Sequence, residues 1–161
     1  MGVCIGALSF ALNTRANTKS RQVALFTNIM QTLNSEEGAK RYLEVMSMEW
    51  TSFEDFKRKY DSSVNVDSWA KRSALWELGD YVAWQYRAGI VDMETVYNLG
   101  GKKLVSLWEK FKPIIEEYRK TEYEPDDFAG WEEMVEAYKK WVKDNPQVMK
   151  FRRMGSAVAT K

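Results

Sequence analysis

Histidine is absent from the 161-residue sequence, and cysteine occurs only once, at Cys4. Without histidine, the chain cannot form a Ser-His-Asp or Cys-His catalytic group, or any metal site that requires an imidazole ligand. A single cysteine permits no internal disulfide. Cys4 also lies in an apolar run with no basic neighbour to favour its thiolate, so we do not expect it to act as a nucleophile.

Residues that break helices are also scarce, with 3 prolines, 9 glycines and no proline before Pro113. Such a composition favours helix. Apolar residues recur at helical spacing along most of the chain, and no segment alternates with a period of two for long enough to require a strand. We therefore predict an all-α fold, a single bundle-like domain of about six or seven helices over residues 15–144 that begins with a long N-terminal helix.

Capping residues and glycines predict the boundaries of the individual helices. Ser52 and Asp92 are expected caps, and Asp67 or Ser68 is expected to begin the longest helix, which Gly89 ends. The expected helices cover residues 15–33, 36–48, 53–60, 68–88, 93–98, 102–121 and 131–143.

The periodicity also predicts which helix faces are buried. The helix over 36–48 is expected to bury Ala39, Tyr42, Leu43 and Met46. In the helix over 68–88, Gly79 costs ~1 kcal/mol of helix propensity relative to alanine. We therefore expect Gly79 to let another helix approach closely.

Pro113 lies in the middle of the amphipathic helix over 102–121. On a helical projection it falls opposite Leu104, on the outside of that helix. A proline ring displaces the carbonyl of the residue four positions earlier, here Glu109, and opens the helix on that side. We predict an exposed Pro113 and a kink near 109–113 that is convex to solvent.

Two polar side chains are candidates for a ligand-binding site. Arg72 lies on the densest apolar face of the helix over 68–88. Either its stem packs while its guanidinium reaches water or a carboxylate, or it forms a buried anion site. Glu77 stands between Trp76 and Leu78, so it is a candidate for a buried acid, although its angle places it off the main apolar face.

The sequence offers no other chemistry that we can assign. The glycines and lysine at 100–102 do not have the spacing of a phosphate-binding loop. Adjacent acidic residues point about 100° apart on a helix, so they do not chelate one metal ion together. We expect no catalytic residue, no metal site and no cofactor.

The N-terminal segment 1–14 is apolar, and residues 3–12 carry no charge. A membrane-spanning helix needs ~20 apolar residues, and a signal peptide carries its basic residues before the apolar run. Here Arg15, Lys19 and Arg21 follow the run, as basic residues do on the cytoplasmic flank of a membrane helix. Two interpretations remain, an apolar helix end that packs on the domain or the inner part of a longer membrane helix.

Positive charge gathers at the two ends of the chain, in residues 13–22 and in the tail over 145–161, which we expect to be flexible. The body between them is acidic. In a nucleic-acid-binding domain the positive charge forms one face of the folded unit. We therefore do not expect nucleic acid to be a partner.

Three stretches have a familiar order and spacing: IGALSFALNTRANTKSRQVALF (5–26), MEWTSFEDFKRKY (48–60) and GIVDMETVYNLGGKKLVSLWEKFKPIIEEYR (89–119). Over most of residues 5–142 the chain resembles an uncharacterised prokaryotic family, domain of unknown function 4760. The resemblance implies one N-terminal membrane helix, a basic flank and a cytoplasmic helical domain, and it supplies no catalytic residues. By this analogy we favour the end of a membrane helix at residues 3–12.

Together these features indicate a non-catalytic, membrane-proximal helical interaction or scaffold module. We expect it on the cytoplasmic side of the membrane if the N-terminal helix is longer in the native protein, and in the cytoplasm otherwise. One alternative is a soluble helical partner protein or homo-oligomer whose segment 3–12 packs against protein. Another is a small-ligand sensor or enzyme built around Arg72, Glu77 and the tryptophans.

Overall fold

The computed structural model describes residues 20, 24 and 26–148, and these residues form helices and connecting loops without a strand. Helical residues 26–34 are followed by α2 (Glu36–Met46), α3 (Phe53–Tyr60), α4 (Val66–Arg87), α5 (Met93–Asn98), α6 (Gly101–Thr121) and α7 (Ala129–Asp144). Residues 146–148 are again helical, beyond the predicted end of the bundle. The predicted all-α class is confirmed.

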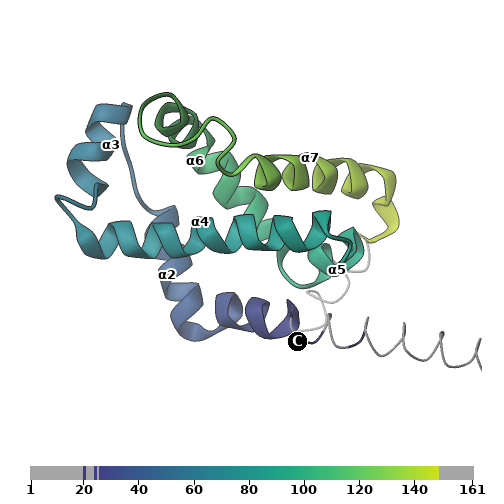
Figure 1. Cartoon of the computed structure of the whole chain (residues 1–161). Coiled ribbons are helices and arrows are strands. Elements are labelled where there is room, and N and C mark those ends of the chain that lie inside the picture. Colours follow the sequence, from purple (N-terminus) through teal and green to yellow (C-terminus); the bar gives the residue numbers. More distant parts are fainter. Residues whose placement is uncertain (1–19, 21–23, 25, 149–161) are drawn as a thin grey trace, which may run out of the picture.

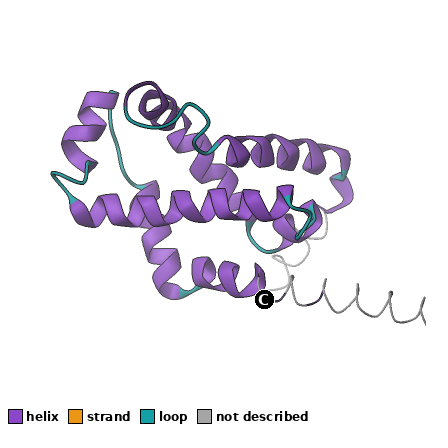
Figure 2. Cartoon of the chain, in the orientation of Figure 1, coloured by secondary structure: helices purple, strands orange, loops and turns teal. Residues whose placement is uncertain are grey.

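The longest helix, α4, crosses the middle of the molecule (Figure 1). In that view α7 runs along one side of α4, α2 lies on the other side, and α5 follows the end of α4. The connections are short loops and turns (Figure 2). This arrangement covers α4 from several directions and leaves part of its surface to solvent.

Helix caps show how local sequence begins these elements. Ser52 accepts a hydrogen bond from the backbone N–H of Asp55, and Asp92 accepts one from that of Thr95. The prediction for α4 was wrong, because Asn65 is the cap and accepts from the N–H of Ser68. An asparagine carbonyl caps as well as an aspartate does, so the residue types at 65, 67 and 68 do not by themselves decide where α4 begins.

The buried face of α2 also differs from the prediction. Leu43 is 65% exposed, whereas Val45 and Gly38 are buried. A β-carbon built at Gly38 would lie only 2.0 Å from the carbonyl oxygen of Thr32. This close approach to the preceding turn fixes the rotation of α2 and turns Leu43 outward.

The core is rich in aromatic side chains, and α6 supplies much of it. Its inner face buries Leu104, Val105, Leu107, Trp108, Phe111, Ile114, Ile115 and Tyr118. Pro113 lies inside α6 and is exposed, as predicted. The bend at 109–113 stays a prediction.

Several sequence-based expectations fall outside the part of the chain that the structure describes. They are the apolar segment 1–14, the basic flank at Arg15, Lys19 and Arg21, and tail residues 149–161. Among the helices that are described, none combines the length and the apolar character needed to cross a membrane.

Candidate functional site

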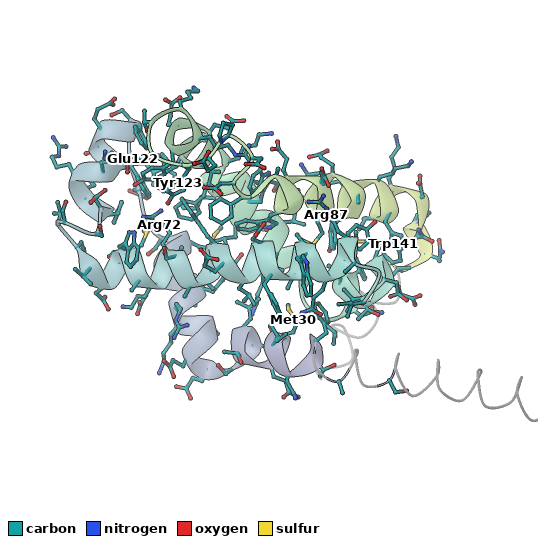
Figure 3. All side chains as sticks on the ribbon, viewed as in Figure 1. Met30, Arg72, Arg87, Glu122, Tyr123 and Trp141 are labelled. Atoms are coloured by element: carbon teal, nitrogen blue, oxygen red, sulfur yellow. The ribbon has the colours of Figure 1, made fainter. Side chains whose placement is uncertain are left out.

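Arg72 is buried inside a cage of aromatic rings and is only 1% exposed. Its guanidinium carbon lies 4.3 Å from the ring centroid of Trp76, 5.1 Å from Phe56 and 5.7 Å from Tyr118. The rings come from α3, α4 and α6, so the cage joins three helices. In Figure 3, Arg72 lies between α4 and the segment that carries Glu122 and Tyr123.

The guanidinium makes few polar contacts. Nε and Nη1 have no hydrogen-bond partner among the described residues, and the guanidinium lies close enough to the Tyr123 hydroxyl to affect its titration. Burial raises the pKa of the Tyr123 hydroxyl, and the neighbouring guanidinium opposes that rise. The expectation that the head of Arg72 reaches water or a carboxylate is therefore wrong, because the charge rests on aromatic faces, which attract cations.

Glu77, the second candidate, is exposed. Five residues separate it from Arg72, which places the two side chains about 140° apart around α4. The structure therefore does not bring Arg72 and Glu77 into one site. Arg72 serves the packing of α3, α4 and α6, and Glu77 belongs to the opposite surface.

That opposite surface carries a regular row of exposed residues, which we call the outer stripe of α4. Its members are Ala70, Ala74, Glu77, Tyr81, Trp84 and Ala88, and all of them are exposed. Their separations alternate between four and three residues, so they lie on one face of the helix. Only one of them, Glu77, is charged.

Two large rings project from the C-terminal half of the stripe. Trp84 is 55% exposed and Tyr81 is 47% exposed. Their rings stack, with centroids 5.9 Å apart and planes inclined by 20°. Because each ring limits the motion of the other, the pair forms a preorganised apolar projection.

The N-terminal half of the stripe is hollow instead. Two surface depressions meet at Ala74. A groove of about 480 Å³ between α2 and α4 is lined by Ala70, Ala74, Lys71, Asp67, Glu37, Lys40, Arg41 and Glu44. A smaller hollow of about 210 Å³ is lined by Ile29, Thr32, Leu33, Gly38, Arg41, Ala74, Leu75 and Leu78. Apolar side chains therefore form the floor of the smaller hollow, and charged groups surround the larger groove.

A polar cleft of about 380 Å³ lies elsewhere, at the start of α6. Lys103 lines it, but its Nζ donates to Asn34 Oδ1 at 2.9 Å and lies 5.6 Å from the ring centroid of Tyr42. This lysine is therefore already engaged within the protein. Within residues 20, 24 and 26–148, no three side chains of the metal-binding types come together.

Helical periodicity does not by itself reveal the outer stripe, because α4 carries apolar residues on more than one face. Its inner face, with Leu75, Trp76 and Val82, dominates the projection. The available signal was a second row of small and aromatic residues with separations of four and three on the opposite face.

A family described as Domain of unknown function (DUF4760) matches residues 1–141. No curated protein and no solved structure matches the chain in these comparisons.

Proposed function

The chain belongs to the DUF4760 family, and we propose that it is a non-catalytic helical interaction module that works next to a membrane. The observation that carries this proposal is the outer stripe of α4, where Tyr81 and Trp84 are half exposed. Exposed large rings on an otherwise well-packed helix are typical of protein interfaces, where aromatic residues are enriched.

The core does not explain these rings. Tyr81 and Trp84 stack on each other and project from α4. Because each ring is about half exposed, it forgoes only part of the 1.5–3 kcal/mol or so that full burial of a large apolar side chain provides. A partner that covers both rings would recover part of that free energy.

The membrane-proximal half of the proposal rests on sequence. Residues 3–12 are uncharged, and Arg15, Lys19 and Arg21 follow them. Basic side chains next to an apolar segment favour the anionic cytoplasmic leaflet by about 1 kcal/mol each. This arrangement would place the helical domain close to the lipid surface.

Oxidative footprinting tests whether the outer stripe is a binding surface, whichever partner covers it. We expect Tyr81 and Trp84 to react several-fold more slowly in cells that contain the chain than in dilute purified protein. Leu43, which is 65% exposed on α2, is the matched control and should react equally in both samples. Equal reactivity of all three residues in both samples would reject an interface at the stripe.

Vesicle flotation tests the membrane half separately. The chain should float with vesicles that contain anionic lipid, and a variant with Arg15, Lys19 and Arg21 replaced by glutamate should float less. A chain that stays at the bottom of the gradient would remove the membrane from the proposal and leave the interface intact.

A further inference from the structure

Arg72 carries a buried positive charge that no carboxylate of the described residues balances. The side chain is only 1% exposed, and Nε and Nη1 have no hydrogen-bond partner among those residues. A buried ion without a countercharge is strongly unfavourable, and each buried N–H without an acceptor adds a further cost. The aromatic faces offset part of this cost, but they supply no negative charge.

A second arginine near the core has the partners that Arg72 lacks. Arg119 donates from Nε to the carbonyl oxygen of Asp127 at 2.8 Å and from Nη1 to Oε2 of Glu132 at 3.1 Å. Its side chain is 15% exposed. The less deeply buried arginine thus has a carboxylate partner, and the more deeply buried one has none in the described part of the chain.

A third unpartnered donor lies beside the guanidinium. The ring centroid of Trp76 is 4.3 Å from Cζ of Arg72, and the buried Nε1 atom of that indole also has no partner among the described residues. One acceptor at hydrogen-bond distance from two nitrogens can bridge donors up to about 6 Å apart. All three groups donate, so an acceptor would satisfy them, and the charge of Arg72 favours a negative one.

The carboxylates near the cage are engaged elsewhere. Burial raises the pKa of Tyr118, and the charges of Asp61 and Glu122 add to that rise, so both acids lie close by. Oδ1 of Asp61 accepts from the backbone N–H of Ser63 at 3.0 Å and from its hydroxyl at 2.9 Å. Glu122 pairs with Lys57. A countercharge for the cage would therefore come from outside the chain.

We propose that a small anion, of the size of chloride, binds at Arg72 and accepts hydrogen bonds from Nε, Nη1 and the indole N–H of Trp76. A water molecule could accept the same bonds, but it would leave the charge unbalanced. This site goes beyond the proposed function and is independent of the outer stripe.

The aromatic cage limits the size of the anion. The ring centroids of Phe56 and Tyr118 lie 5.1 Å and 5.7 Å from the guanidinium carbon. Arg72 lines none of the surface hollows described above. A phosphate or an organic carboxylate would have to displace these rings, so a halide ion suits the site best.

The turn between α6 and α7 closes the cage and offers a route for the ion. Tyr123 stacks on Tyr118, with centroids 4.8 Å apart, and Phe128 meets Trp76 edge to face at 5.8 Å. Residues 122–128 are all half-buried or exposed. A small outward motion of this turn would therefore admit a halide without unfolding a helix.

Thermal unfolding at constant ionic strength tests the site in solution. Replacing gluconate by chloride should raise the Tm of the full chain by about 2–4 °C, as expected for a ligand at several times its Kd that binds only the folded state. Arg72→Met should abolish this shift. Trp76→Phe keeps an aromatic ring but removes the indole N–H, so it should reduce the shift. An equal shift in the parent and in both variants would overturn the proposal.

Lys102→Met is the matched control, because it removes an exposed lysine of the polar cleft at the start of α6. This variant should keep the chloride shift of the parent. Loss of the shift in Lys102→Met but not in Arg72→Met would place the anion at α6 and would contradict a site in the cage.

Crystals of the full chain grown in sodium bromide locate the ion directly, because bromide scatters anomalously. A peak should lie within hydrogen-bond distance of Nε or Nη1 of Arg72 and should be absent from crystals of Arg72→Met. Peaks at exposed lysines alone would mark an adventitious ion only and would reject the site. A water molecule at Arg72 without anomalous signal would reject it as well.

Discussion

The indole of Trp131 on α7 lies directly against the backbone of Gly79 on α4, and this contact joins the two helices. A β-carbon built at Gly79 would lie 2.4 Å from Cε2 of Trp131, and that indole is fully buried. The close helix approach predicted from the glycine is therefore confirmed, and the ring that fills the space is a tryptophan.

Gly79→Ala should lower the free energy of unfolding by about 1–3 kcal/mol, because a methyl group must displace a fully buried indole. The change would gain ~1 kcal/mol of helix propensity if the space were free. Ala70→Gly, at an exposed position of the same helix, should cost the same ~1 kcal/mol and therefore measures the helix-propensity contribution alone. Urea unfolding followed by circular dichroism measures both. A Gly79→Ala variant as stable as the parent would show that Trp131 can move aside.

Arg72→Met should leave the free energy of unfolding within about 1 kcal/mol of the parent value. The buried guanidinium has no carboxylate partner among the described residues, and an apolar side chain of similar size often replaces a buried charge without loss. Arg72→Ala should cost about 2–4 kcal/mol, because it leaves a cavity. Equal losses in both variants would mean that the attraction between cation and rings outweighs the cost of burying the charge.

Asp55 makes stability depend on acid pH. The hydrogen bond from Lys59 lowers the pKa of this carboxyl from 3.8 to about 2, together with bonds from the backbone of Thr51 and from Arg58. Because the folded pKa lies below the unfolded one, the ionised carboxyl of Asp55 stabilises the folded protein. This stabilisation is present above pH 3.8 and is lost as the pH falls toward about 2. The difference in unfolding free energy between the parent and Asp55→Asn should narrow over that range. A constant difference would show that the carboxylate charge contributes nothing.

The sequence predicted the helices well where caps and glycines carry local information. Asp92 caps α5, and Gly89 follows α4 with a φ of 66° that favours glycine. The buried face of α2 was not predictable, because a contact between Gly38 and the preceding turn decides it. That contact joins two helical segments and leaves no signal in the periodicity of either.

The candidate site shows the same contrast between features that local sequence predicts and contacts between helices that it does not. The position of Arg72 on the inner face of α4 followed from the helix projection, but the burial of its guanidinium did not. That burial depends on Phe56 and Tyr118, which lie on other helices and required the fold. The sequence does not distinguish Trp84 from the buried tryptophans, because exposure depends on which helices pack against α4. Only the packing of α2 and α7 around α4 shows which apolar face is left uncovered.

Asp80 should destabilise the protein at neutral pH. Burial raises the pKa of its carboxyl above 3.8, and Asp127 adds to the rise while Arg87 opposes it. The folded state therefore holds this proton more tightly, and stability decreases as the pH rises through the folded pKa. Asp80→Asn should be more stable than the parent at pH 7, with the advantage disappearing below pH 3.8. Thermal unfolding across this range measures it, and a less stable variant at neutral pH would contradict the assignment.

Pro113→Ala should raise the free energy of unfolding by about 1 kcal/mol. Proline in a helix interior costs ~3 kcal/mol through its missing N–H and its clash with the preceding turn, and its restriction of the unfolded chain returns only part of that cost. Pro113 is exposed, so the change removes no core contact, and alanine restores a donor to the carbonyl of Glu109. Chemical unfolding measures the gain. Glu116→Ala, an exposed change in the next turn, controls for alanine propensity and removes only an exposed ion pair with Lys112, whose Nζ lies 3.8 Å from Oε1 of Glu116. A loss of stability in Pro113→Ala would show that the predicted bend is needed to pack α6 around the core.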